Sequence, residues 1–208
     1  AIAVVQRVLA IPLKRFERPL LGFLSRAEMD AILAAPDASH WSGRRDQMLL
    51  RTMYNTGARV SEITALRADD VSFGDRAFIR IVGKGRKERT IPLWRSTRDG
   101  LKDWLSHLRQ DGGGPLFANR KGEHLSRSGV EARLRVAVRA ATKTCPTLAG
   151  RRVSPHIIRH TTAMHLLQSG VDITVIALWL GHESPTTTHQ YVEADLSMKE
   201  RALAKLQD

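Results

Sequence analysis

The sequence predicts a mainly α-helical protein with one small antiparallel β-sheet, an α+β fold. Most of the chain beyond residue 22 carries apolar residues at helical spacing, between residues that start and stop helices. Residues 77–93 instead alternate apolar and polar side chains on both sides of a glycine-containing turn, which is typical of a β-hairpin. A chain of 208 residues with 42% hydrophobic content can bury the core of one domain.

Helix signals precede the hairpin. Ser25 is an N-cap residue whose capping-box partner is Glu28. The next apolar segment contains Tyr54, which we expect in the core, and ends before Gly57 because glycine readily adopts the left-handed conformation that stops a helix. The expected helices of this part run over 25–33, 46–54 and 60–66, and the expected strands over 77–82 and 89–93.

Helices make up most of the chain after the hairpin. A glycine-rich break lies at 112–114, and the helix after it begins at Ser128 with Glu131 as its capping partner. Ser154-Pro155 begins another, since serine caps helices and proline fits their first turn. The expected helices run over 97–109, from 128 onwards, and over 155–169, 173–180, 185–194 and 196–206.

The charge of the chain favours a polyanionic partner. The excess of Lys and Arg over Asp and Glu gives a formal net charge of +12, which attracts nucleic acid through counterion release and long-range steering. Only 5% of the residues are aromatic, so a groove that follows duplex phosphates is favoured over a platform that stacks single-stranded bases. A membrane surface is the alternative partner, but it requires a basic amphipathic helix with a bulky apolar face, and the sequence offers no strong candidate.

Other compositional features exclude several classes of protein. A single cysteine, Cys145, cannot form an intramolecular disulfide framework or a Cys-rich zinc site. The sequence has no 18-residue apolar run of the kind that spans a membrane. We therefore expect a soluble protein of a reducing compartment.

Residues 1–22 differ from the rest of the chain. They contain two prolines and mix apolar with basic residues, as an arm or an interdomain linker does. We expect the compact domain to occupy residues 23–208.

The last third of the chain holds polar side chains suited to phosphodiester chemistry. Arg159 can bind phosphate oxygens through its guanidinium, whereas His156, His160 and His182 can transfer protons near neutral pH. The phenol of Tyr191 can attack phosphorus and hold it covalently. Each also has an ordinary interpretation: polar residues on the solvent face of a helix, a histidine after a helix C-terminus, or a surface tyrosine.

Two upstream segments hold further basic candidates. Arg59 follows a glycine turn at a helix start, where it suits a second phosphate-binding guanidinium that Glu62 could orient. Lys84 lies at the tip of the hairpin with Arg86 and Lys87, and could reach into a groove as a point charge or an acid. The alternatives are a surface Arg59–Glu62 pair and a solvated basic turn.

Taken together, these segments resemble the tyrosine recombinases, the phage-integrase family that includes the Xer recombinases. The resemblance runs from about residue 24 to the C-terminus. The segments that carry it are TGARVSEITALR around Arg59, VGKGRKERTIPL around Lys84, SPHIIRHTTA around His156 and Arg159, and LWLGHESPTTTHQY from His182 to Tyr191.

The resemblance implies a catalytic role for each matching residue. Arg59 and Arg159 would bind the scissile phosphate and stabilise its transition state, and Lys84 would protonate the departing 5′ oxygen. Tyr191 would be the nucleophile that forms a 3′-phosphotyrosyl link. His156 would assist proton transfer, and His182 would be the second, hydrogen-bonding histidine. Such a site needs no metal, ATP or other cofactor.

The resemblance also implies partners and a domain arrangement. The partner would be double-stranded DNA, on which such proteins act as a tetrameric synapse, and the protein would be a bacterial or phage-encoded one of the cytoplasm. Family members usually carry a separate N-terminal domain that closes over the duplex. Because only about twenty-two residues precede the catalytic region, we expect either a fragment that begins in the linker, monomeric and weak in DNA binding by itself, or a naturally short member.

Two other functions stay open. A type IB topoisomerase shares the catalytic logic but relaxes supercoils without pairing two sites. A DNA-binding module that has lost catalysis would share the fold, although the presence of all the expected polar groups argues against it.

Overall fold

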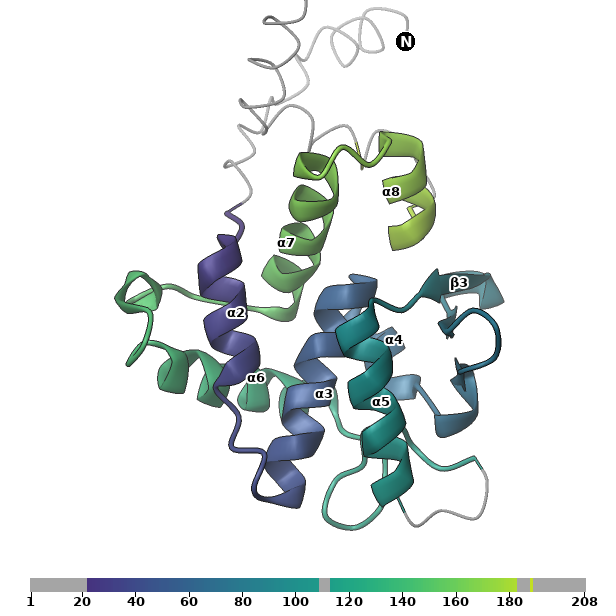
Figure 1. Ribbon diagram of the computed structural model, residues 1–208, viewed down its shortest axis with the longest axis horizontal. Helices are drawn as coiled ribbons and strands as arrows, with labels where there is room; N and C mark the ends of the chain where they lie inside the picture. The colour runs from purple at the N-terminus through teal and green to yellow at the C-terminus, as the bar shows by residue number, and fades with distance from the viewer. Residues whose placement is uncertain (1–21, 109–112, 183–187, 189–208) are drawn as a thin grey trace, which may run out of the picture.

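The mainly α-helical fold with one small antiparallel sheet is confirmed (Figure 1). The computed structural model describes residues 22–108, 113–182 and 188. Their helices are α2 (Arg26–Ala34), α3 (Trp41–Thr56), α4 (Val60–Ala65), α5 (Arg95–His107), α6 (Arg127–Ala141), α7 (Pro155–Gln168) and α8 (Ile173–Leu180). Short 3-10 turns lie at Ala68–Asp70, Lys84–Arg86 and Pro146–Leu148. The strands are β1 (Val71–Ser72), β2 (Phe78–Val82) and β3 (Glu88–Pro92).

Helix α3 lies at the centre of the fold and contacts α2, α4, α5, α6 and α7. Its residues Leu49, Leu50 and Met53 are almost fully buried, and so is Tyr54, as the sequence predicts. Gly57 stops the helix as expected, with a φ of +57°, but the helix runs to Thr56, two residues beyond the predicted end at Tyr54. It begins at Trp41 rather than at residue 46, because its first turn is mostly polar and gives no apolar periodicity to detect.

The predicted hairpin is present, and β2 pairs with β3 in an antiparallel register that places Ile81 opposite Arg89. The inward side chains of Ile79, Ile81 and Ile91 are buried and alternate with exposed residues. A third strand, β1, pairs with the outer edge of β2 and was not predicted, because two residues are too few to show a period.

The C-terminal helices are also close to prediction, with one correction. Helix α6 begins at Arg127, and its N-cap is Ser126, whose hydroxyl accepts a hydrogen bond from the Gly129 N–H at 3.0 Å. The predicted start at Ser128 with Glu131 as capping partner is therefore wrong, because an earlier serine already caps the helix. Ser154 caps α7 as expected, and Asp172 caps α8.

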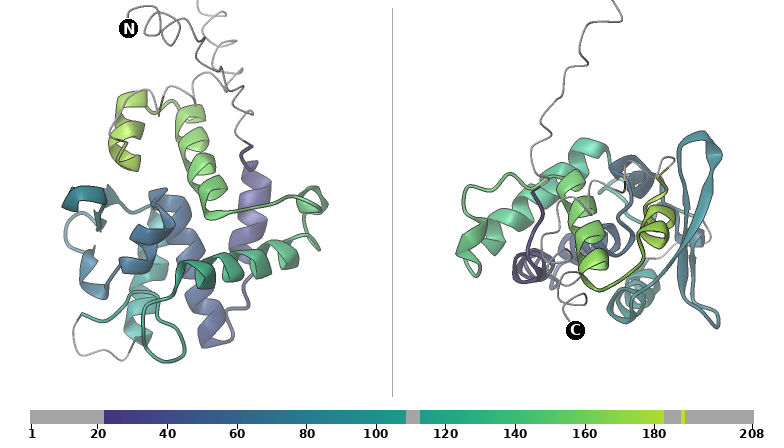
Figure 2. Two further views of the ribbon diagram at one scale, coloured as in Figure 1. Left: turned by 180° about the vertical axis from the view of Figure 1, so that it is seen from behind. Right: turned by 90° about the horizontal axis from the view of Figure 1, so that it is seen from above.

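The ends of α3 and α8 approach each other closely, and this contact places the candidate site. Gly57 and Gly181 both have positive φ and end these two helices. A Cβ added at Gly57 would lie 2.5 Å from Cδ2 of Leu180 and would be strained at the positive φ of this residue, so glycine favours this close approach. Figure 2 shows α8 beside both α7 and the hairpin, seen from behind and from above.

Several predictions fall outside the described residues. They are the N-terminal arm over 1–21, the helices over 185–194 and 196–206, and the position of Tyr191. Within the described ranges, no helix is both long enough and apolar enough to cross a membrane.

Candidate active site

An open pocket of about 580 Å³ gathers residues from three separate parts of the chain. Arg59 and Ser61 come from the start of α4, and Ala177, Leu178, Gly181 and His182 come from α8 and the turn after it. The hairpin supplies Gly83, Lys84, Lys87, Glu88 and Arg89. Three of the predicted site residues, Arg59, Lys84 and His182, therefore line one cavity.

Arg59 is held at the N-cap of α4 by Glu62. Its backbone N–H donates to Oε2 of Glu62 at 2.8 Å, and its Nη1 donates to Oε1 at 3.1 Å. Nη2 also donates to the carbonyl oxygen of Gly181 at 3.5 Å, across the pocket. The Arg59 side chain is still 44% exposed, so its position is fixed while its charge faces solvent.

Glu62 forms a second and more buried ion pair, with Arg89 of β3. The guanidinium donates from Nη2 to Oε2 at 2.7 Å and from Nη1 to Oε1 at 3.2 Å. Burial by itself raises the pKa of the Glu62 carboxyl, but the hydrogen bonds and charges of Arg89, followed by those of Arg59, hold it below the ordinary value of 4.5. Glu62 is therefore an anion that two arginines share.

Arg89 is not among the predicted site residues, although the sequence carries a signal for it. Arg89 lies two positions before the buried Ile91, on the same face of β3, and opposite the buried Ile81. A charged residue at an inward position of a strand requires a partner, since an unpaired buried charge is costly. The strand pattern could thus have indicated an ion pair, but not which carboxylate forms it.

Arg159 lies in the core, with 4% of its surface exposed. Its Nη1 donates to the carbonyl oxygen of Gly57 at 2.6 Å, and its Nη2 donates to that of Leu180 at 2.7 Å. The alternative of an arginine on the solvent face of a helix is therefore wrong. Arg159 instead joins the C-terminal ends of α3 and α8 and brings a positive charge beneath the pocket.

His156 and His160 lie one turn apart on α7, with ring centroids 4.1 Å from each other. His156 is exposed, whereas His160 is buried. Burial, followed by the charges of Arg159 and Arg59, lowers the pKa of His156. Burial, followed by His156 and Arg159, lowers the pKa of His160 to about 4. Both imidazoles are therefore neutral near pH 7 and able to accept a proton.

His182 follows the turn at Gly181 and is half-buried. Its Nδ1 lies 2.8 Å from Oγ1 of Thr188, a buried residue three positions before Tyr191. Burial, followed by the charges of Arg159 and Arg59, lowers the pKa of His182 to about 4. His182 therefore serves as a neutral hydrogen-bonding group in the unliganded protein.

The hairpin tip is basic and exposed. Lys84 and Lys87 line the pocket, whereas Arg86, with a φ of +59°, does not. Gly85 has a φ of +70°, the left-handed conformation that lets the tip turn sharply. The tip therefore presents its cations on a short turn beside the pocket.

The arrangement is suited to an anionic ligand. Four cationic side chains line the pocket, those of Arg59, Lys84, Lys87 and Arg89, together with one anionic side chain, that of Glu88. A concave site with an excess of one charge concentrates ligands of the opposite sign. Among the described residues, no group of three or more His, Cys, Asp or Glu side chains lies close enough together to hold a metal ion.

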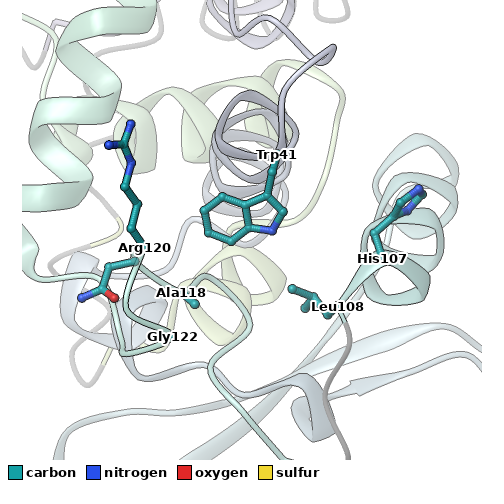
Figure 3. A pocket seen from close by; sticks show the side chains of 7 residues that line it. Trp41, His107, Leu108, Ala118, Arg120 and Gly122 are labelled. Atoms are coloured by element: carbon teal, nitrogen blue, oxygen red, sulfur yellow. The ribbon is translucent and has the colours of Figure 1, made fainter.

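A second pocket lies at the other end of α3 (Figure 3). It has a volume of about 410 Å³, and Trp41, His107, Leu108 and Arg120 are among the residues that line it. Trp41 begins the sixteen-residue helix α3, so this pocket lies about 24 Å along the helix from Gly57. None of the predicted site residues contributes to it.

Comparison with known proteins places this geometry in a family. A profile described as the phage integrase family matches residues 22–198. The chain belongs to the phage integrase family. The match includes all six predicted site residues, Arg59, Lys84, His156, Arg159, His182 and Tyr191.

Named recombinases are among its relatives. The integrase/recombinase y4rC of Sinorhizobium fredii is 54% identical over 98% of this chain. The tyrosine recombinase XerD of Pseudomonas aeruginosa is 34% identical over 96% of this chain. This phage integrase family chain spans 61% of the length of y4rC and 64% of that of XerD.

Solved structures share the fold. The crystal structure of XerA recombinase superimposes with a TM-score of 0.75 at 26% identity, over 96% of this chain and 68% of XerA. A post-cleavage complex of XerH recombinase with its palindromic difH substrate gives 0.73 at 25% identity, over 91% of this chain and 54% of XerH.

Proposed function

We propose that this chain supplies the catalytic domain of a site-specific DNA recombinase or integrase, which cleaves and rejoins duplex strands through a covalent 3′-phosphotyrosyl intermediate. The observation that carries the proposal is the pocket, where Arg59, Lys84 and His182 meet although the chain separates them widely. Membership of the phage integrase family supports the reaction type.

Cleavage exchanges one phosphate ester for another. The phenolic oxygen of Tyr191 attacks the scissile phosphorus and gives up its proton, and a bond from that oxygen to phosphorus forms. The bond from phosphorus to the 5′ oxygen breaks, and its electron pair leaves with the oxygen, which takes a proton from the Lys84 ammonium. In the reverse step a 5′-hydroxyl attacks the phosphotyrosyl bond. The number of phosphoester bonds is conserved, so rejoining needs neither ATP nor a metal.

The other site residues act on charge and protons. The guanidinium groups of Arg59 and Arg159 stabilise the negative charge that builds on the phosphate oxygens, and both are held in place before DNA binds. His156, a neutral imidazole with a lowered pKa, accepts the phenol proton. His182 donates a hydrogen bond to the phosphate. Glu62 supports Arg59, and His160 supports His156.

Double-stranded DNA is the proposed partner. The XerH structure is a post-cleavage complex with difH DNA, and a Tn1549 transposon integrase of the same fold was solved with circular-intermediate DNA. The net charge of +12 supports binding to a polyanion. Arg86 and Lys87, at the exposed tip of the hairpin, are the proposed contacts to DNA phosphates. On DNA we propose assembly of like subunits into a synapse, and a DNA-associated role in the bacterial cytoplasm.

A nicked duplex that traps the covalent intermediate tests this function. The DNA carries a site that the complete gene product selects from a random-sequence library. A nick lies close to the cleaved bond, so that the short fragment carrying the new 5′-hydroxyl diffuses away and cannot rejoin. We expect a protein–DNA adduct that survives denaturing electrophoresis. Tyr191→Phe removes the nucleophilic oxygen and should abolish it.

The second tyrosine of the chain provides a matched control. Tyr54 is buried, and its hydroxyl lies 2.6 Å from Nδ1 of His165, so Tyr54→Phe should keep the adduct. An adduct that persists in Tyr191→Phe, or none with the wild-type protein, would contradict the proposal. Relaxation of supercoils without exchange between two sites would instead indicate a type IB topoisomerase.

A further inference from the structure

We infer that Arg89 is a positioning residue that docks the base of the Lys84 hairpin against α4 and the end of α8. By this docking, Lys84 on one wall of the pocket faces Arg59 and His182 on the other. The inference rests on the proposed function, because positioning matters only if Lys84 and Arg59 act on the same phosphate.

The Arg89 guanidinium contacts two elements at once. Its Nε donates to the carbonyl oxygen of Trp179, in the last turn of α8, at 3.0 Å. Its Nη1 and Nη2 donate to the two carboxylate oxygens of Glu62, in α4, at 3.2 and 2.7 Å. Arg89 itself belongs to β3, so a single side chain joins the hairpin to both other walls of the pocket.

The backbone turns beside the pocket also lie against this ion pair. A Cβ at Gly181, the residue before His182, would lie 2.9 Å from Nη1 of Arg89 and 3.2 Å from its Cζ. A Cβ at Gly83, the residue before Lys84, would lie 3.2 Å from Oε1 of Glu62. Both glycines therefore allow the turn that carries a catalytic residue to approach the Arg89–Glu62 pair.

The contacts require an arginine. A guanidinium donates in several fixed directions, so it can pair with both oxygens of a carboxylate and still reach a carbonyl, whereas a lysine ammonium is a point charge on a flexible stem. The Arg89 side chain is 12% exposed and that of Glu62 is 4% exposed, so water competes little for these bonds. Arg80, on the neighbouring strand, is 50% exposed and serves as the matched control.

A distance measurement without DNA tests the docking directly. Nitroxide labels are placed on Val82→Cys and Val175→Cys in a Cys145→Ser background, since both valines are exposed, one at the end of β2 and one on α8. We expect Arg89→Gln and Arg89→Lys to broaden the distance distribution between the labels, while Arg80→Gln leaves it unchanged. A distribution in Arg89→Gln as narrow as in the wild type would overturn the inference.

A substrate change tests whether the docking serves Lys84. A 5′-bridging phosphorothiolate at the cleaved bond leaves as a thiolate, which needs no proton, so it removes the need for a general acid. In the nicked-duplex assay with the complete gene product, we expect Arg89→Gln to slow adduct formation about 10²-fold on the ordinary duplex, as misplacement of a catalytic group does. The same variant should lose only a few-fold on the phosphorothiolate, judged against wild type on that substrate.

The outcomes separate this inference from the proposed function. Equal slowing on both substrates would overturn the assignment to Lys84, because a general loss of folding or of Arg59 affects both alike. If the wild-type protein forms no adduct on either substrate, the proposed function fails, and the label distances still decide whether Arg89 docks the hairpin.

Discussion

Two carboxylates, those of Glu62 and Asp70, have the same kinds of partner, but only Glu62 is buried. Glu62 and Asp70 each accept a hydrogen bond from the backbone N–H three residues earlier, at the start of α4 and of the 3-10 turn Ala68–Asp70. Each also pairs with an arginine of the hairpin, Glu62 with Arg89 and Asp70 with Arg80. Glu62 and Arg89 are 4% and 12% exposed, whereas Asp70 and Arg80 are 13% and 50% exposed.

The two ion pairs share one local pattern, but their different burial means that they contribute unequally to stability. Water screens the Arg80 pair, and exposed ion pairs contribute little to stability. The Arg89 pair lies between three elements, and removal of Glu62 there leaves the Arg89 charge without its counterion and with little access to water. The buried pair borders the pocket, and the exposed pair lies outside it.

The largest expected effect comes from deletion of each carboxylate. Glu62→Ala should lower the free energy of unfolding by about 3–5 kcal/mol, because it leaves the Arg89 charge buried and unpaired. Asp70→Ala should cost about 1 kcal/mol, mainly for the lost backbone cap. Urea unfolding of both variants measures this, and equal losses would mean that burial does not distinguish the two pairs.

The next effect is on pH dependence. The pKa of Glu62 in the folded protein lies below its ordinary value of 4.5, so its contribution is present above that value and is lost as the pH falls through the lowered pKa. The gap in unfolding free energy between wild type and Glu62→Gln should therefore shrink from pH 5 downwards. Protonation of buried histidines such as His165, whose pKa is about 4, lowers the stability of both proteins alike between pH 6.5 and 4 and cancels in the gap. A gap that stays constant in acid would contradict the lowered pKa.

The smallest effect is the coupling within the exposed pair. A double-mutant cycle with Arg80→Ala and Asp70→Ala should give a coupling energy below about 1 kcal/mol that falls further in high salt. The corresponding cycle with Arg89→Ala and Glu62→Ala should give roughly 2–3 kcal/mol and respond less to salt. Similar coupling energies in the two cycles would remove the basis for the comparison.

Local sequence signals predicted the fold correctly where the interacting residues are close together in the sequence. Ser25 and Glu28 form the expected capping box, and Gly57 stops its helix as expected. Prediction was wrong or incomplete where the local signal was weak or had a competitor. The polar first turn of α3 hid its start, Ser126 capped α6 ahead of Ser128, and β1 was too short to detect.

The sequence likewise identified the candidate residues of the site but not the contacts that hold them. Side-chain chemistry and the resemblance to the tyrosine recombinases singled out Arg59, Lys84, His156, Arg159 and His182, and the structure brings Arg59, Lys84 and His182 to one pocket. Their catalytic roles stay predictions, as does that of Tyr191, which lies outside the described residues. The sequence could not indicate that the Arg159 guanidinium donates to the carbonyls of Gly57 and Leu180, because those partners lie 102 and 21 positions away.

The sequence by itself determined most of the helices, the hairpin, the basic charge and the set of candidate side chains. The helices and the hairpin follow from capping and from the period of the side chains, which depend on residues close together in the sequence. The charge and the set of candidate side chains follow from composition, which depends on no contact between residues. Only the tertiary structure decided which carboxylate the inward-facing Arg89 meets, and how far that pair is buried. That choice depends on how α4, β3 and α8 pack together, since burial, rather than residue type, sets the strength of an ion pair.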